Sequence, residues 1–230
     1  MNMNKLLYLL TLSFYSYFLT GQEIVITDSD LQGDTVYNWT KENTYILDGL
    51  VFLEAGGILN IEAGTVLRSR QFPSEDDVSV LIIARGAQIN AIGTADAPII
   101  FTAEDDDLSR TNDVRHVDRG VWGGVILMGN APIFAGSQDE VSLPGLGHPE
   151  QNQYGGSIPG ESSGLLSYVS IRHCGAGLTL DLRLAGLTLA GVGSGTILHH
   201  IEVIASGSIG VELLGGTAQL KYIVSALYSD

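Results

Sequence analysis

The chain has 230 residues, of which 26 are acidic and 11 are basic, giving a formal net charge of −15 at pH 7. A surface this acidic repels nucleic acid and anionic lipid, so we expect no nucleic-acid partner, and it attracts cations. The only cysteine, Cys174, allows no internal disulfide, and we expect it to be a small buried residue of the core.

Residues 1–21 have the pattern of a secretory signal peptide. Lys5 supplies a short positive region, and Leu6 to Leu19 is apolar apart from small polar and tyrosine residues. This run is too short and too weakly apolar for a membrane span. Cleavage is expected near Gly21-Gln22, which predicts a secreted or cell-surface protein. The mature chain, residues 22–230, is long enough for one domain with a sizeable core.

Short runs of β-branched and apolar residues, bounded by Gly, Asn and Pro, follow the leader and are typical of strands. The mature chain has no sustained period of 3.6, so long helices are not expected. One phrase occurs three times, as LSYVSI from Leu166, LHHIEV from Leu198 and LKYIVS from Leu220. Such repetition predicts a solenoid, whose coils bury their apolar faces by stacking on one another.

A coil of 22 residues, the spacing of the last two phrases, with three short strands fits an all-β, right-handed parallel β-helix. The 29 glycines suit sharp corners between strands. An antiparallel sandwich is the alternative, but the two-residue hairpin turns that it needs are scarce. Three polar segments should loop out of the coils, where solenoids often carry their binding sites: residues 68–77, 104–119 and 136–163.

The strongest chemical signal is a run of four carboxylates: Glu104, Asp105, Asp106 and Asp107. Adjacent carboxylates repel one another, and a hard cation such as calcium relieves this by accepting oxygen ligands. The spacing is not that of an EF-hand. The alternative is a solvated acidic loop, balanced by Arg110, Arg115 and Arg119. We therefore expect no cofactor, and calcium at this segment is the alternative that the sequence leaves open.

Catalytic candidates are few. Polysaccharide lyases on this fold use an Arg or Lys base, so Arg172 with nearby Glu202 is the lyase candidate. A hydrolase would need two carboxylates about 5–9.5 Å apart, and Glu202 and Glu212 are the acids of the late strands. We favour a structural role for all three residues, and the sequence assigns no catalytic site. We expect His173 to face inward as a hydrogen-bonded core histidine, and no nucleophile elbow, phosphate loop or HExxH motif is present.

The adjacent His199 and His200 resemble a metal-binding pair. Alignment of the three phrases instead places His200 in one column with Tyr168 and Tyr222, which would stack from coil to coil. His199 falls in a solvent-facing column. Because neighbouring strand residues point to opposite faces, we expect that the two imidazoles do not share an ion.

Several segments, among them YILDGLVFLEAGGILNIEAGTVL, APIIFTAEDDDLS, RGVWGGVILMGNAPI and SGLLSYVSIRHCGAG, resemble secreted right-handed β-helix proteins of Bacteroidetes-type bacteria within the pectin-lyase-like superfamily. The resemblance covers nearly all of the mature chain. It implies the fold, export and an extracellular setting, and it implies no reaction. This chain lacks an acidic pair of the family at Ser208-Ile209, and it stops at Ser229-Asp230 where members usually continue.

These observations favour an exported, non-enzymatic β-helix that serves as a scaffold for adhesion or carbohydrate contact, with an extracellular polysaccharide or a cell-surface protein as partner. One alternative is a polysaccharide lyase or glycoside hydrolase acting on an extracellular glycan, and another is a truncated paralogue without activity. A chain lacking its C-terminal coils would leave its last coil, residues 220–228, open. We then expect self-association through that coil.

Overall fold

The structure is a computed structural model, and it describes residues 21–74, 76–106, 108, 115, 118–134, 139–148, 150–179 and 182–227. The predicted signal peptide falls, apart from Gly21, outside these residues. Within them the chain forms 17 strands and one short 3₁₀ turn, η1 (Asp28–Asp30). No helix of the described part is long and apolar enough to cross a membrane.

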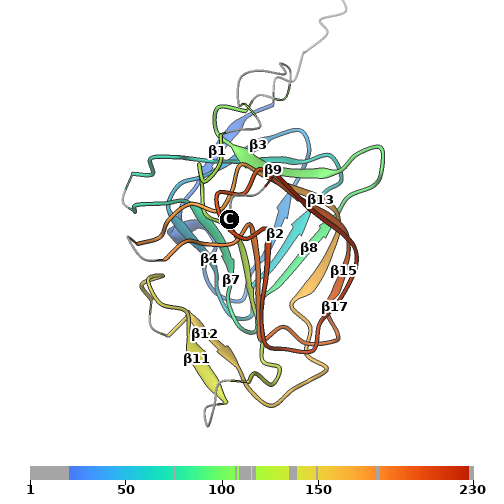
Figure 1. Ribbon diagram of the computed structural model, residues 1–230. Helices are drawn as coiled ribbons and strands as arrows, with labels where there is room; N and C mark the ends of the chain where they lie inside the picture. Colours follow the sequence, from blue (N-terminus) through green and yellow to red (C-terminus); the bar gives the residue numbers. More distant parts are fainter. Residues whose placement is uncertain are drawn as a thin grey trace, which may run out of the picture.

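Each full coil places one strand in a five-stranded sheet and then two strand segments in a ten-stranded sheet (Figure 1). The five-stranded sheet consists of β4 (Leu50–Leu53), β7 (Val80–Ile83), β10 (Gly124–Met128), β14 (Leu187–Ala190) and β16 (Val211–Leu214). All its neighbouring pairs are parallel. The all-β parallel β-helix predicted from the repeats is therefore confirmed.

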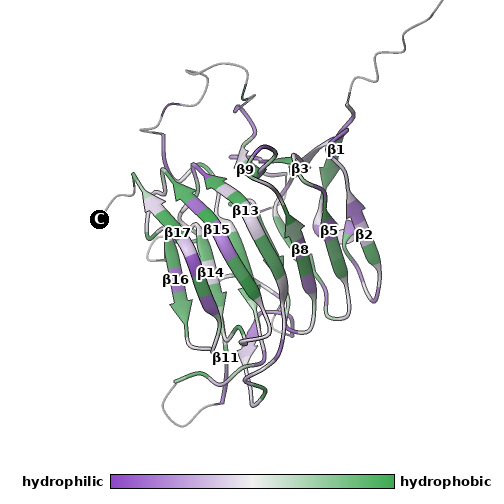
Figure 2. Ribbon diagram, turned by 90° about the vertical axis from the view of Figure 1, so that its right-hand side faces the viewer, coloured by the Kyte–Doolittle hydropathy of each residue, from purple (hydrophilic) through white to green (hydrophobic). Residues whose placement is uncertain are grey.

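The ten-stranded sheet contains two parallel ladders that merge along the chain (Figure 2). The first ladder is β2 (Val36–Trp39), β5 (Ile58–Ile61) and β8 (Gln88–Ile92). The second is β1 (Glu23–Ile26), β3 (Thr44–Leu47), β6 (Val66–Ser69) and β9 (Ile99–Ala103). Three longer strands continue both ladders: β13 (Gly164–Arg172), β15 (Ile197–Ile204) and β17 (Gln219–Ala226).

The two ladders merge because the corner between them shrinks to one residue. In the early coils several residues form this corner, such as 40–43 between β2 and β3. In the last three coils a single left-handed residue makes the bend: Tyr168, His200 and Tyr222, with φ of 49°, 53° and 57°. The register pairs Leu166 with Leu198 and Leu198 with Leu220, as the repeated phrase predicts.

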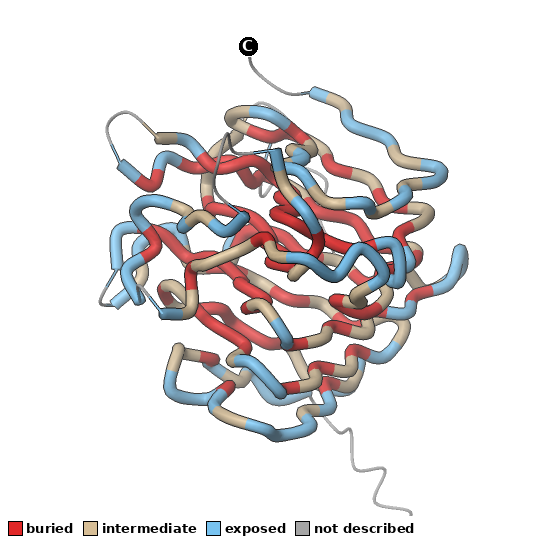
Figure 3. The backbone as a smooth tube through the Cα atoms, turned by 90° about the horizontal axis from the view of Figure 1, so that it is seen from below, coloured by how far each residue is buried: buried red, intermediate tan, exposed pale blue. Residues whose placement is uncertain are grey.

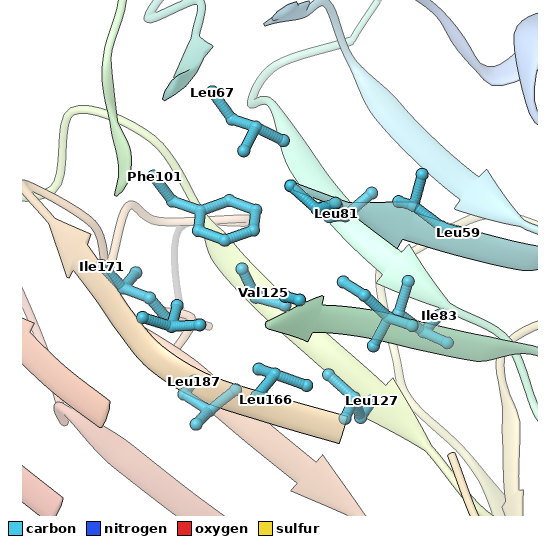
Figure 4. Packing of buried hydrophobic residues seen from close by; sticks show 14 of the residues in the cluster. Leu59, Leu67, Leu81, Ile83, Phe101, Val125, Leu127, Leu166, Ile171 and Leu187 are labelled. Carbon is cyan, nitrogen blue, oxygen red and sulfur yellow. The ribbon is translucent and has the colours of Figure 1, made fainter. Parts of the chain in front are cut away.

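The interior of the coils is a continuous apolar core (Figures 3 and 4). Alternate residues of each strand point inward, and the same positions of successive coils stack on one another. Leu81, Val125 and Leu187, for example, are register neighbours on β7, β10 and β14, and all three are fully buried. The core therefore follows directly from the repeated spacing of apolar residues.

The five-stranded sheet is buried on its outer face as well. Its outward residues form a second cluster that includes Phe52, Ile82, Ile126 and Met128. Leu146, Leu143 and Tyr154 pack on this cluster from the excursion at residues 129–163, which holds an antiparallel hairpin of β11 (Glu140–Ser142) and β12 (Gln153–Gly155). Burial on both faces explains why LVFL, VLII and GVILM are apolar without alternation.

The predicted loops differ in detail from those observed. The loop expected at residues 68–77 starts at 70, because Arg68 and Ser69 belong to β6 and pair with β3 and β9. The excursion predicted at 136–163 begins after β10 and is a cover for the second cluster as well as a surface loop. Much of 104–119 lies outside the described residues.

The outer edge of β4 is covered by side chains of η1 and of the loop before β7. The amide of Leu50 donates to Asp76 Oδ2 at 2.9 Å, and the amide of Phe52 donates to Asp28 Oδ1 at 3.0 Å. The carbonyl of Leu31 accepts from Glu54 at 3.3 Å. These contacts satisfy donors that would otherwise present an open strand edge.

Candidate functional site

Two neighbouring cavities lie at the corner where β3, β6 and β9 lead into the five-stranded sheet. The larger has a volume of about 500 Å³ and is lined by Thr27, Asp28, Ser29, Gln32, Asp48, Ser74 and Asp76. The smaller has a volume of about 270 Å³ and is lined by Arg70, Gln71, Phe72, Glu104, Asp105 and Val121. We call the two cavities together the corner groove.

An ion-pair column separates the two cavities. Asp48, Arg70 and Glu104 directly follow β3, β6 and β9, so they occupy the same position on three successive coils. Arg70 Nη1 binds Asp48 Oδ2, and Arg70 Nε lies 3.4 Å from Glu104 Oε1. Ser74 donates its amide to Asp48 Oδ1 at 2.7 Å and its hydroxyl to Oδ2 at 2.8 Å. The column thus joins three coils and anchors the loop that walls the groove.

Burial alone would raise the pKa of the Asp48 carboxyl. The hydrogen bonds from Ser74 and the charge and hydrogen bond of Arg70 outweigh burial, and the pKa of Asp48 is held below its usual range. The carboxylate is therefore ionised in the folded protein at neutral pH. Its negative charge holds the Arg70 guanidinium, which lines the smaller cavity, against the wall of the larger one.

The walls of the groove combine hydrogen-bonding groups with one exposed ring. Asp28 and Asp76 each use one oxygen to cap β4, and Asp28 Oδ2 lies 3.6 Å from His148 Nε2. The ring of Phe72 is 83% exposed beside the smaller cavity. A few polar groups at fixed positions next to an apolar surface are typical of small-molecule sites.

The structure separates the four carboxylates of the predicted calcium segment. Glu104 pairs with Arg70, and Asp105 lines the smaller cavity. Asp106 is buried, and its Oδ2 accepts from the Thr102 hydroxyl at 2.6 Å. Asp107 lies outside the described residues. No group of three or more His, Cys, Asp or Glu that could hold a metal occurs in the described ranges, so calcium binding at this segment stays a prediction.

Arg172 and Glu202 meet on the outer face of the ten-stranded sheet, but Glu212 does not join them. Arg172 Nη2 lies 3.5 Å from Glu202 Oε1. The hydroxyl of Ser170 accepts from Arg172 Nε at 2.8 Å and donates to Glu202 Oε1 at 2.5 Å. Glu212 lies on β16 in the other sheet. Glu202 and Glu212 therefore do not form the carboxylate pair of a hydrolase.

The aromatic column predicted from the repeats is present. Tyr168 and His200 stack at 4.4 Å with an interplanar angle of 9°, and His200 and Tyr222 stack at 4.6 Å with an angle of 21°. The prediction that His199 points away from His200 is wrong, because their Nδ1 atoms are 2.9 Å apart. The left-handed backbone at His200 interrupts the alternation of side chains and turns both imidazoles to the same side.

Two residues near the end of β13 behave as the sequence predicts. His173 is buried, and its Nδ1 lies 2.7 Å from the carbonyl oxygen of Asp118. Cys174 is fully buried, and this burial raises the pKa of its thiol to about 12. Such a thiol is protonated at neutral pH and inert.

Glu161 was not predicted from the sequence. This half-buried carboxylate precedes β13 in the chain and lies against the corner that follows β14. Gly193 donates its amide to Glu161 Oε1. A side chain at Gly193 would clash, because its Cβ would lie 2.5 Å from the Glu161 carbonyl oxygen. Burial raises the pKa of Glu161, and hydrogen bonds from Gly193, Ser163 and Asn130 only partly offset it. An acidic residue between Gly-rich corners is the signal that could have pointed to it.

The comparison with known proteins agrees with this geometry. Residues 31–230, which include every strand from β2 to β17, match the pectate-lyase-like β-helix domain. The chain belongs to that family. No curated protein and no solved structure matched the chain. Membership in the pectate-lyase-like β-helix family establishes the fold and leaves the function to be argued from the corner groove and the aromatic column.

Proposed function

We propose that the protein is an exported β-helix of the cell surface or the extracellular space, and that it contacts carbohydrate through the corner groove without turning it over. The corner groove carries the proposal, because it provides two adjacent cavities on a rigid frame. The predicted signal peptide at residues 1–21 supports the extracellular setting.

The chemistry of the groove suits a polyhydroxyl ligand. Carboxylates, hydroxyls and the amide of Gln32 can each exchange hydrogen bonds with sugar hydroxyls. The exposed ring of Phe72 offers the apolar face on which the C–H side of a sugar ring can lie. The larger cavity, at about 500 Å³, falls in the range of small-molecule sites.

The frame of the groove favours binding because its polar groups are already held in place. Asp48 is fixed by Ser74 and Arg70, while Asp28 and Asp76 are fixed by the amides of β4. Side chains that are ordered before the ligand arrives lose little entropy when it binds. These carboxylates already accept hydrogen bonds from the protein itself. This favours a role in binding over a role as catalytic acids or bases.

A lyase that uses Arg172 is the second candidate, supported by its contact with Glu202. The guanidinium of Arg172 is engaged by Ser170 and Glu202, which opposes proton abstraction by it. A turnover assay on acidic polysaccharides separates the two candidates. Release of unsaturated or reducing ends would support an enzyme, and binding without release would support the scaffold.

The test of the binding site is a glycan array run with residues 22–230, followed by calorimetry on the best glycan. Phe72→Ala should weaken binding several-fold, because it removes the exposed ring beside the smaller cavity. Phe134→Ala is the matched control, since that ring is 98% exposed and does not line the groove. Equal affinity of Phe72→Ala and Phe134→Ala, or no glycan bound at all, would refute the proposal.

A further inference from the structure

The imidazoles of His199 and His200 converge on the outer face of the ten-stranded sheet. Their Nδ1 atoms are 2.9 Å apart, and the rings are perpendicular, with an interplanar angle of 89° and centroids 5.0 Å apart. Both residues are partly exposed. At this separation one Nδ1 donates a hydrogen bond and the other accepts it, so a single proton occupies the space between two good metal-binding nitrogens.

The position of the pair is fixed by the aromatic column. Tyr168 and Tyr222 hold the ring of His200 from both sides at 4.4 Å and 4.6 Å. The ring of His199 meets the edge of Tyr168 at 6.3 Å and 88°. The left-handed backbone at His200, with φ of 53°, sets the direction of its side chain. A site held in this way before binding loses little entropy when an ion arrives.

The separation of the nitrogens selects the geometry of the ion. With metal–nitrogen bonds of about 2.05 Å, the observed 2.9 Å corresponds to a nitrogen–metal–nitrogen angle of about 90°. That angle joins two cis positions of a square-planar or tetragonal ion, the geometry of Cu(II) and Ni(II). A tetrahedral zinc ion would need the nitrogens about 3.3 Å apart.

We propose that His199 and His200 form a two-imidazole site for Cu(II), with water in the remaining positions. On binding, the proton between the rings moves to Nε2 of the donor ring. Each ring also turns about χ2, because the ion lies about 45° off the line that joins the two Nδ1 atoms. No oxidation or reduction is involved. Because affinity rises from Ni(II) to Cu(II) and falls again at Zn(II), Cu(II) should bind most tightly of the three.

The surroundings of the pair make a further prediction. Lys221 is the register neighbour of His199 on β17, so its backbone lies beside the proposed site and its ammonium is within reach of the ion. Like charges repel, and Lys221→Gln should therefore tighten Cu(II) binding. If the two histidines only hydrogen-bonded to each other and bound no ion, Lys221→Gln would leave the Cu(II) titration unchanged.

The experiment is a titration of residues 22–230 with Cu(II), Ni(II) and Zn(II), by calorimetry and by electron paramagnetic resonance for Cu(II). We expect one Cu(II) per chain, with nitrogen coupling from two imidazoles. His200→Phe keeps an aromatic ring in the column and removes its nitrogens, while His199→Ala leaves the column intact. Each should weaken Cu(II) binding at least about tenfold, since even partners that only orient a ligand cost 10–100-fold.

His148→Ala is the control, because it removes a partly exposed imidazole that pairs with Asp28 and lies far along the chain from the site. It should leave Cu(II) affinity unchanged. The proposal is overturned if His199→Ala and His200→Phe bind Cu(II) like the parent chain, or if the spectrum shows coupling from a single imidazole. A melting curve checks that each variant is folded, and His199→Ala decides the matter if His200→Phe is not.

Discussion

Truncation of His200 to alanine should destabilise the fold measurably, because its ring is the middle of the aromatic column. It makes two stacked contacts, with Tyr168 at 4.4 Å and Tyr222 at 4.6 Å. Each such contact contributes about 0.5–1.5 kcal/mol beyond the area that it buries. Losing both predicts a decrease of about 1–3 kcal/mol in the free energy of unfolding. For a chain of this size, a loss of about 2 kcal/mol lowers the melting temperature by about 4–8 °C.

Two further variants at position 200 separate the stack from the backbone. His200→Phe keeps both stacked contacts and loses only the hydrogen bond to His199, so its stability should stay within about 1 kcal/mol of the parent chain. His200→Gly loses the stack but relieves the left-handed strain of about 1–2 kcal/mol, and it should be more stable than His200→Ala.

The assay is urea unfolding of residues 22–230, monitored by circular dichroism. A chelator is present so that bound metal does not contribute to stability. The reasoning would be refuted if His200→Ala and His200→Phe unfolded at the same urea concentration. In that case the stacking seen in the column would contribute nothing to stability, and the alignment of Tyr168, His200 and Tyr222 would be a consequence of the register alone.

Four other predictions follow from the fold and the site. The pKa of Asp48 is lower in the folded protein than in the unfolded chain. The stability that this carboxylate contributes is therefore present above the unfolded pKa near 3.8 and is lost as pH falls through the folded pKa. Asp48→Asn should flatten the acid limb of a stability–pH curve. The pKa of Glu161 is raised, so the sign is opposite. The stability that this carboxyl contributes is complete below its unfolded pKa near 4.5 and is lost as pH rises through the folded pKa. Glu161→Gln should therefore gain stability relative to the parent chain as pH rises above about 4.5. Amino-terminal sequencing of the exported protein should find a start near Gln22, and a start at Met1 would contradict export by the predicted leader. Residues 22–230 prepared alone should form oligomers that scatter light at micromolar concentration. The reason is that the last described coil exposes Tyr222, Val224 and Leu213. A stable monomer would argue against self-association through this coil.

The coil ladder could be predicted because it depends on residue type at a repeated spacing. Leu166, Leu198 and Leu220 are identical and occupy one inward position, so alignment of the phrases was enough to place them. The stacked column followed from the same alignment. The direction of His199 could not be predicted, since the left-handed bend occurs at Tyr and His residues, which carry no signal comparable to glycine.

The corner groove escaped prediction for a different reason. Asp28, Asp48 and Asp76 come from three coils whose corners differ in length, so no fixed spacing relates them. Asp48, Arg70 and Glu104 do share a position after successive strands, and the alternation of their charges could have indicated an ion-pair column. The capping of β4 by Asp28 and Asp76 depends on the three-dimensional path of the chain and leaves no local pattern.

Burial of the five-stranded sheet on both faces limits how this solenoid can be re-engineered. Repeat proteins are usually lengthened or shortened by copying one coil, since each coil contacts only its neighbours. Here β7 and β10 also depend on the excursion that holds Leu146, so a coil duplicated from this region would present Ile82 or Ile126 to water. The coil that runs through β14 and β15 is the better module for extension. The two strand segments of β15 are joined by one residue. The residues of β14 that point outward from the five-stranded sheet, Thr188 and Ala190, are small.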